Sequence, residues 1–196
     1  MAKLFYQGHG SFRITADDGR VIFIDPYVGD GYDLPADIIL VSHQHHDHNC
    51  VELITQKPGC VVISNEEALA GGRHNSFSFD GIEIEAVEAG NKNHDPACCV
   101  GFIVTLDGVK VYATCDTSAT AAMAGFAARG LDYALLTCDG VYNMGLEESA
   151  ECARIIGARH NVPVHMMPGA LFDRERAEQW PGPNRLILEP GEEITL

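Results

Sequence analysis

The sequence predicts a mixed α/β fold in which two β-sheets pack against each other with helices on the outside. Three Asp-Gly pairs, at residues 18–19, 80–81 and 107–108, each separate two short apolar or alternating segments and therefore predict β-hairpins. Further strands alternate with helical segments along the rest of the chain. A strand-rich chain with hairpins and separate helices favours sheets packed on sheets over a doubly wound parallel sheet.

The individual strands are predicted from short apolar or alternating segments bounded by Gly, Pro, Asn or Asp. Segments of this kind are too short for helices and have the composition of strands. We expect strands at residues 4–7, 11–15, 21–24, 38–41, 60–64, 76–79, 82–87, 102–106, 109–113, 133–137, 162–165 and 186–188.

Four segments have helical features. The first begins near Asp47 and ends before Lys57, with its apolar side chains on one face. The second, residues 118–129, has apolar residues at helical spacing. The third, residues 146–157, carries two acidic residues in its first turn, where the helix dipole favours negative charge. A short fourth helix is expected within residues 173–179.

Length and composition place the chain among globular proteins. We expect one domain spanning residues 1–196. The apolar runs are far shorter than the roughly 20 residues that cross a membrane, and the N-terminus lacks the apolar core of a signal peptide. The seven cysteines include no C-x-x-C pair. We therefore expect a cytoplasmic protein without membrane contact, whose cysteines act as small apolar side chains.

The net charge limits the partners that the protein can have. The chain has 13 Lys and Arg against 28 Asp and Glu, a formal charge of −15, which repels nucleic-acid phosphates and anionic membranes. The basic residues are scattered and form no stripe, so we expect no nucleic-acid partner, and a nuclease is a disfavoured function. A small-molecule substrate is expected instead, and the composition leaves a homo-oligomer open.

Histidines are concentrated in one short segment. Four of the nine lie between residues 43 and 48, as His43, His45, His46 and His48, together with Asp47. The segment follows the predicted strand 38–41, which gives it a rigid support. His43 and His45 are two residues apart and point the same way in an extended chain, whereas His46 should point away. Imidazoles and a carboxylate at this spacing predict a site for zinc, iron or manganese.

This H-x-H-x-D-H loop resembles that of the metallo-β-lactamase superfamily, and three later residues extend the resemblance. His94 stands before a predicted strand, Asp116 ends a strand, and His165 ends a late strand. The resemblance covers essentially the whole chain. It implies a four-layer αββα sandwich with metal ions at one edge, between the two sheets.

The same resemblance implies a centre with two metal ions. It assigns His43, His45 and His94 to the first ion, Asp47, His48 and His165 to the second, and Asp116 to a bridge between them. We expect two divalent ions, with zinc as the first choice and manganese or iron as alternatives. Two such cations make the site locally positive, so an anionic small molecule stays possible despite the acidic chain.

Four more residues are candidates for orienting the ligands or contacting the substrate. The segments 8–14, 23–26 and 142–144 look like those of small hydrolases related to ascorbate-6-phosphate lactonase, which is longer, so its substrate does not transfer. On this resemblance His9 supports the ligands or contacts the substrate. Asp25 ends an apolar strand and could orient a ligand histidine, and Tyr142 or Asn143, in a loop at the expected metal edge, could donate to a substrate oxyanion. Each has a structural alternative: a hydrogen-bonded histidine, a turn carboxylate, or a loop that holds a helix start.

The resemblance further implies a metal-dependent hydrolase. In that interpretation a metal-bound hydroxide attacks an ester, lactone, thioester or phosphodiester, and Asp47 is the catalytic residue that orients it and accepts its proton. An alternative with the same fold is a mononuclear-iron enzyme that oxidises a sulfur substrate. A purely structural metal module is disfavoured, because closed structural sites usually need only four ligands.

Overall fold

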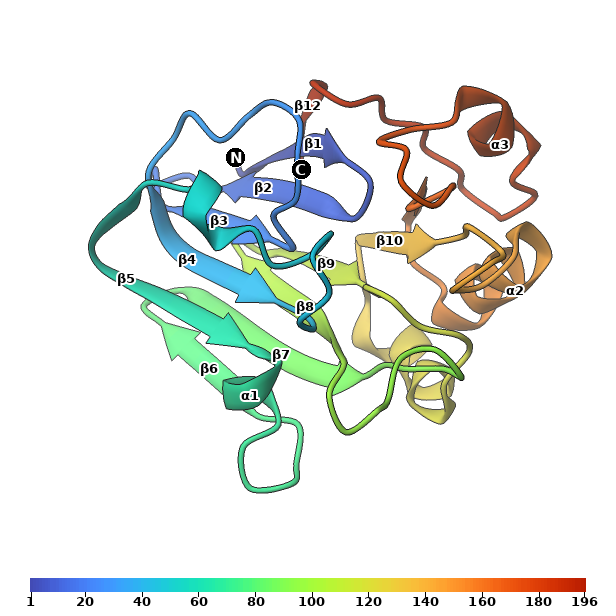
Figure 1. The fold of residues 1–196 in the computed structure, drawn as a ribbon, viewed down its shortest axis with the longest axis horizontal. Coiled ribbons are helices and arrows are strands. Elements are labelled where there is room, and N and C mark those ends of the chain that lie inside the picture. The colour runs from blue at the N-terminus through green and yellow to red at the C-terminus, as the bar shows by residue number, and fades with distance from the viewer.

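The computed structural model describes residues 1–196 and contains two six-stranded sheets that face each other (Figure 1). The first sheet has the strand order β12-β1-β2-β3-β4-β5 and the second has the order β11-β10-β9-β8-β7-β6. The strands of the first sheet are β1 (Lys3–Gly8), β2 (Ser11–Thr15), β3 (Val21–Ile24), β4 (Ala36–Val41), β5 (Gln56–Ser64) and β12 (Glu193–Thr195). Those of the second are β6 (Ser76–Phe79), β7 (Ile82–Glu88), β8 (Val100–Leu106), β9 (Val109–Ala113), β10 (Tyr133–Thr137) and β11 (His160–Val164).

The three hairpins predicted from the Asp-Gly pairs are all present. They join β2 to β3, β6 to β7 and β8 to β9, each as an antiparallel pair. In contrast, β3, β4 and β5 run parallel to one another, as do β9, β10 and β11. Both sheets are therefore mixed, which confirms the predicted α/β fold class.

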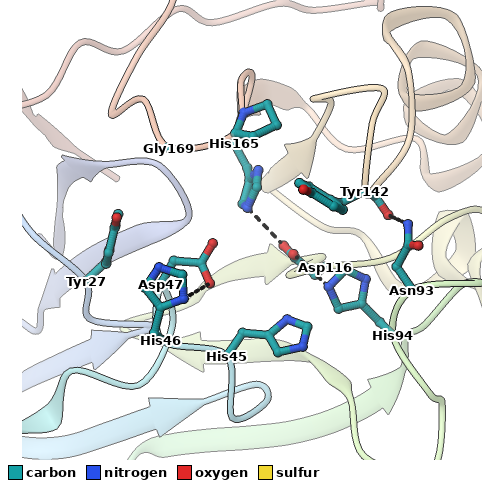
Figure 2. Close-up of a pocket in the computed structure, with 11 residues that line it drawn as sticks. Tyr27, His45, His46, Asp47, Asn93, His94, Asp116, Tyr142, His165 and Gly169 are labelled. Carbon is teal, nitrogen blue, oxygen red and sulfur yellow. Dashed lines mark hydrogen bonds and ion pairs between the residues drawn. The ribbon is translucent and has the colours of Figure 1, made fainter.

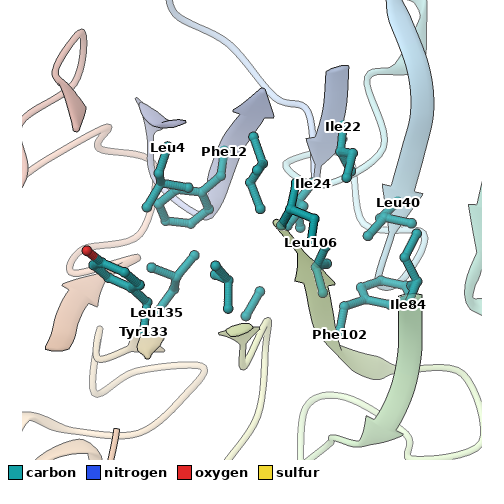
Figure 3. Packing of buried hydrophobic residues seen from close by; sticks show 14 of the residues in the cluster. Leu4, Phe12, Ile22, Ile24, Leu40, Ile84, Phe102, Leu106, Tyr133 and Leu135 are labelled. Atoms are coloured by element: carbon teal, nitrogen blue, oxygen red, sulfur yellow. The ribbon is translucent and has the colours of Figure 1, made fainter. Parts of the chain in front are cut away.

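The main core fills the space between the two sheets (Figure 3). Alternate side chains of each strand point into this layer, as the two-residue period of a strand requires. Buried residues such as Leu4, Phe12 and Leu40 from the first sheet meet Phe102 and Leu135 from the second. This packing fixes the relative position of the two sheets, so that loops from both can meet at one edge.

Helices cover the outer face of the second sheet (Figure 1). They pack through a second buried cluster that includes Met123, Phe126, Ala153 and Trp180. None of the helices is both long and apolar enough to pass through a membrane. Their bounds are η2 (Ala121–Arg129), α2 (Leu146–Ile156) and α3 (Arg174–Gln179), while α1 (Asn65–Ala68) and the 3₁₀ turn η1 (Val51–Leu53) belong to the first half of the chain.

The outer face of the first sheet has a thinner cover than the second. Its buried cluster has only six residues, and the cover comes from loops and η1 rather than from an α-helix. The helix predicted from Asp47 to before Lys57 is therefore wrong except for its single 3₁₀ turn. One reason is that the N–H of Cys50 donates to the C=O of Pro26 instead of to a helical partner. A second is that β5 already begins at Gln56 and pairs with β4.

Other differences from the predicted elements are local. Residues 121–129 form a 3₁₀ helix rather than an α-helix, in a segment of small side chains with Gly125 at its middle. Residues 186–188 form no strand, and the only pairing beside them is an isolated bridge from the preceding Arg185 to Asn161 of β11. The short helix α1 was not predicted, although Ser64 and Glu67 form a capping box at its start. All seven cysteines are free. Cys99, Cys138 and Cys152 are buried as expected, whereas Cys98 is exposed and the other three are half-buried.

Candidate metal centre

The predicted ligands converge at one edge of the sandwich, where parallel strands of both sheets end. The H-x-H-x-D-H loop follows β4, Asp116 follows β9, and His165 follows β11. His94 lies in the loop between β7 and β8. Because the carboxyl ends of parallel strands meet at the same edge, loops that are distant in sequence come together there. Figure 2 shows several of these side chains turned towards a common centre.

The first set of predicted ligands forms one compact group. The ligand atoms of His43, His45 and His94 all lie within 4.8 Å of one another. Nε2 of His43 is 3.1 Å from Nδ1 of His45. His43 and His94 are buried, whereas His45 is exposed at the surface of the cleft. This arrangement offers three imidazole nitrogens to one point.

The second set forms a neighbouring group with one additional member. Ligand atoms of Asp47, His48 and His165 lie within 4.8 Å of one another, and His9 belongs to the same group. Nε2 of His9 is 3.2 Å from Oδ2 of Asp47, and its ring lies 3.7 Å from that of His165 between centroids. His9 therefore contacts two predicted ligands directly, at the place where the sequence predicts a supporting or substrate-binding residue.

Asp116 lies between the two groups. Its Oδ2 is 3.2 Å from Nε2 of His94, which belongs to the first group. Its Oδ1 is 3.4 Å from Nε2 of His48 and 3.5 Å from Nε2 of His165, which belong to the second. One carboxylate oxygen thus faces each group, which is the arrangement that a bridging ligand requires.

Each buried histidine is held by an oxygen at its outer ring nitrogen. Such contacts fix the tautomer and direct the other nitrogen inwards. The Nδ1 hydrogen bonds are His43 to Ser42 Oγ at 2.9 Å, His48 to Asp25 Oδ2 at 2.9 Å and His94 to Asn91 Oδ1 at 3.0 Å. Nδ1 of His165 lies at ion-pair distance, 3.2 Å, from Oδ2 of Asp139.

Asp25 fixes the H-x-H-x-D-H loop from behind. It is completely buried and sits directly after β3 with a positive φ of 47°. Its carboxylate accepts hydrogen bonds from both the N–H and the hydroxyl of Ser42, at 2.7 Å each, besides its contact with His48. Asp25 is therefore placed to orient the ring of His48. Its carboxylate also accepts a backbone hydrogen bond from Ser42, which is the structural alternative considered for this residue.

Asp139 is the supporting residue that the sequence interpretation missed. Its Oδ2 contacts His165, and its Oδ1 accepts hydrogen bonds from the N–H groups of Val141, Tyr142 and Asn143. The available signal was its position two residues after the strand 133–137, because Asp25 and Asp116 also follow strands that lead to this edge. Local spacing did not connect it with His165, which follows the neighbouring strand β11.

Tyr142 and Asn143 are neighbours in the chain but occupy different positions relative to the cleft. Tyr142 lines the cleft and its side chain is largely exposed, whereas Asn143 is buried beside it. The amide group of Asn143 donates to Asp139 at 2.8 Å and its Oδ1 accepts from Asn91 at 3.2 Å. Asn143 is therefore engaged in holding the loop and does not line the cleft, so of these two candidates only Tyr142 faces a bound substrate. His46 points outwards with an 86% exposed side chain, as predicted.

The charges in the cluster perturb one another strongly. Burial lowers the pKa of His43 to about 3. Burial also opposes a charge on His48, but the carboxylates of Asp116 and Asp25 outweigh it and raise the pKa of His48 to about 9. In the same way, His48 and His165 hold the pKa of the buried Asp116 well below its usual range. The metal-free site is thus a network of carboxylates that attract cationic charge.

Four buried atoms of this network have no hydrogen-bond partner: Nε2 of His48, Oδ1 of Asp116, and both Nδ1 and Nε2 of His165. Nε2 of His48, Nε2 of His165 and Oδ1 of Asp116 face one another at its centre. Unpaired buried polar atoms are costly and rare in folded proteins. Ligands of a tetrahedral ion at roughly 2.0–2.1 Å lie about 3.3 Å apart. The 3.4 and 3.5 Å separations of these three atoms match that spacing. The donor set therefore fits a divalent cation.

A cleft of about 480 Å³ opens directly above the cluster. This volume is within the range of small-molecule binding sites. Five of the predicted ligands contribute to its walls together with neighbouring loops. The lining residues are Tyr27, His45, His46, Asp47, Asn93, His94, Asp116, Tyr142, His165, Pro168 and Gly169.

The sandwich of two mixed sheets and the histidine-aspartate cluster at its edge define a metal-binding fold, and comparison with known proteins agrees. The family model described as the beta-lactamase superfamily domain matches residues 3–165. The chain therefore belongs to the metallo-β-lactamase superfamily.

Individual relatives resemble the whole chain. A UPF0173 metal-dependent hydrolase of Thermococcus kodakarensis is 29% identical, with both chains covered completely. The crystal structure of a protein from Parabacteroides distasonis, described as a metal-dependent hydrolase, is 26% identical with a TM-score of 0.76, over 94% of this chain and 90% of that one. A metallo hydrolase from Ignicoccus hospitalis shares the fold, with 22% identity and a TM-score of 0.77 over 98% and 97% of the two chains.

Proposed function

We propose that the protein is a metal-dependent hydrolase with two metal ions that acts on a small molecule bound in the cleft above them. The observation that carries this proposal is the convergence of the three unpartnered buried atoms of His48, His165 and Asp116. A purely structural role would not explain why three such atoms converge at the spacing of metal ligands below an open cleft. The hydrolase names of the full-length relatives support the same conclusion.

The proposed ligand sets follow the two groups of side chains. His43, His45 and His94 hold one ion, Asp47, His48 and His165 hold the other, and Asp116 bridges them. Bound divalent ions would supply a polarised substrate oxygen and a water molecule that is acidic enough to attack near neutral pH. Zinc is the proposed metal, because imidazole and carboxylate ligands suit it well, and manganese and iron accept the same ligands.

Asp47 is the proposed catalytic residue. Its side chain is 24% exposed and lines the cleft, whereas the bridging carboxylate of Asp116 is almost completely buried. Oδ2 of Asp47 is held by Nε2 of His9 at 3.2 Å. The carboxylate is therefore held in position at the floor of the cleft, where it orients the attacking water and accepts its proton. Substrates consistent with this chemistry are esters, lactones, thioesters and phosphodiesters.

The test compares Asp116→Ala with His46→Ala. Both proteins are purified without chelator, and metal content is measured by elemental analysis together with hydrolysis of a panel of esters, lactones and phosphodiesters. Asp116→Ala should hold less metal than the parent and lose hydrolysis, because the bridge between the ion sites is gone. His46→Ala should keep its metal, because His46 points away from the cluster. Normal metal content and full activity in Asp116→Ala would refute the proposal.

The same metal analysis separates the hydrolase from an oxidative enzyme with the same fold. An oxidative enzyme needs iron, whereas the proposed hydrolase works with a metal that does not change its oxidation state. We expect protein loaded with zinc alone to hydrolyse its substrate without consuming oxygen. Activity that appears only with iron, together with oxygen uptake, would favour oxidation of a sulfur substrate.

A further inference from the structure

The walls of the cleft contain two tyrosines and no lysine or arginine. Tyr27 and Tyr142 stand on opposite sides of the metal cluster (Figure 2). A neighbouring hollow on the other side of His45 and His94 has no lysine or arginine either, and it carries Glu66 and Asp95. The charge of the cleft away from the cluster is therefore neutral to acidic.

From this lining we infer that the substrate is an uncharged acyl compound with a planar or ring-shaped group, bound between Tyr27 and Tyr142 beside the metal ions. This inference rests on the proposed function and names the substrate class of that site. It excludes sugar phosphates and other compounds with an anionic group away from the reacting centre as the preferred substrates. The positive charge of bound metal ions would by itself allow an anionic substrate, but the lining of the cleft disfavours one.

The position of Tyr142 supports a binding role. The N–H of Tyr142 donates to Oδ1 of Asp139 at 2.7 Å, and its C=O accepts from the amides of Asn91 at 3.0 Å and Asn93 at 2.9 Å. Its side chain nevertheless remains 52% exposed. An aromatic side chain left exposed on a backbone that is held by three hydrogen bonds gives a preorganised surface for a planar group.

Tyr27 is held on the opposite wall by other aromatic rings. Its ring centroid lies 5.3 Å from that of His9 and 5.9 Å from that of His46. Its N–H donates to the hydroxyl of Tyr32 at 2.9 Å. Tyr27 thus has both its backbone and its ring fixed, so that little conformational entropy is lost when a ligand packs against it.

The absence of basic side chains argues against an anionic substrate. Sites that select phosphate or carboxylate groups generally use arginine or lysine, whose charged hydrogen bonds are stronger than neutral ones. The metal ions would neutralise one anionic group at the reacting centre. A second anionic group further out would meet Glu66 and Asp95 or the tyrosine faces, and no basic residue lines either hollow.

The experiment compares substrates with the same leaving group. Zinc-loaded protein is assayed with 4-nitrophenyl acetate, which is neutral, and with mono(4-nitrophenyl) succinate, which carries a carboxylate away from the ester group. We expect the ratio of kcat/KM to the uncatalysed rate to be at least about tenfold higher for the neutral ester. A preference for the succinate ester would overturn the inference while leaving the proposed hydrolase intact.

Variants of the two tyrosines test their role as walls. Tyr27→Ala and Tyr142→Ala should each raise KM for the neutral ester by about three- to tenfold, because the ring contact is lost. Tyr27→Phe and Tyr142→Phe keep the ring and should restore the parental KM. Ile155→Ala, an exposed apolar residue on α2, is the control and should not change KM. Unchanged KM in both alanine variants would overturn the inference.

A binding measurement separates the inference from the proposed function. Saturation-transfer NMR with 4-nitroacetanilide, a neutral analogue that resists hydrolysis, reports contact with the protein without turnover. We expect a signal with zinc-loaded parent protein that weakens in Tyr142→Ala and returns in Tyr142→Phe. Equal signals in all three proteins would refute the binding site even if hydrolysis occurs. Clear binding without any hydrolysis would refute the proposed hydrolase instead.

A gain-of-function variant tests the charge argument directly. Pro168 is exposed, lines the cleft and belongs to a turn rather than to a strand or helix. Pro168→Lys should raise kcat/KM for the anionic succinate ester relative to 4-nitrophenyl acetate by about fivefold, as expected for one solvated charge pair. An unchanged ratio would show that the missing basic residue does not determine the preference.

Discussion

Oδ2 of Asp139 lies 3.2 Å from Nδ1 of His165, on the side of the imidazole ring that faces away from Asp116. Although burial opposes ionisation, His165 and the N–H groups of Val141 and Tyr142 hold the pKa of Asp139 at about 2. Asp139 is therefore a carboxylate at neutral pH. The same side chain directs a proposed metal ligand and holds the loop that carries Tyr142.

Asp139→Asn should weaken metal binding without unfolding the protein. An amide can still accept backbone hydrogen bonds, but its NH₂ group cannot accept from Nδ1 of His165. We expect metal affinity to fall by about ten- to a hundredfold, as found for residues that orient metal-bound histidines. Competition with a chromophoric chelator measures the affinity. Asp132→Asn, at the opposite end of the same strand, should leave it unchanged, and equal affinities in all three proteins would contradict the role of Asp139.

Gly10→Ala should also weaken metal binding, through crowding. A Cβ atom at residue 10 would lie 3.1 Å from Cε1 of His48 and 3.8 Å from Cδ2 of His165. His48 cannot move away freely, because Asp25 holds its Nδ1. We therefore expect a lower metal affinity in the same chelator assay. Gly125→Ala has no neighbour within 4 Å of the new Cβ and serves as the matched control.

The metal affinity should rise with pH. Without bound metal the pKa of His48 is raised to about 9, so at pH 7 the imidazole is cationic, with protons on both nitrogens. A metal ion must displace the proton on Nε2, which makes binding weaker as the pH falls below about 9. We expect the association constant to increase by up to about tenfold per pH unit between pH 7 and 9. Calorimetry in buffers of different ionisation enthalpy would show the released proton, and an affinity independent of pH would contradict the assignment.

Trp180→Ala should reduce stability without affecting the metal centre. Trp180 is completely buried beside α2, and its Nε1 donates to Oγ of Ser149 at 3.1 Å. Removing a buried tryptophan typically costs about 3–5 kcal/mol in the free energy of unfolding. Urea unfolding followed by circular dichroism measures this loss, with the exposed Ile155→Ala as the control. A simultaneous loss of bound metal in folded Trp180→Ala would show that the two regions are coupled.

The sequence by itself determined the hairpins and the residues that could bind metal. Asp-Gly turns act over a few residues, and an H-x-H-x-D-H loop after a strand places its side chains by local geometry alone. Those features do not depend on distant parts of the chain. The predicted hairpins therefore agree with the structure. His94, Asp116 and His165 were added by the family resemblance and not by local spacing, and only the fold brings them beside that loop.

Tertiary packing decided the features that depend on partners far away in the sequence. It replaced the helix expected after Asp47 with a loop, because Cys50 bonds to Pro26 and β5 pairs with β4. It brought Asp139 to His165, since β10 and β11 lie side by side only in the folded sheet. It also set Tyr27 and Tyr142, which no local spacing relates, on opposite walls of one cleft. Local patterns determine which groups are available, whereas long-range contacts determine which of them meet.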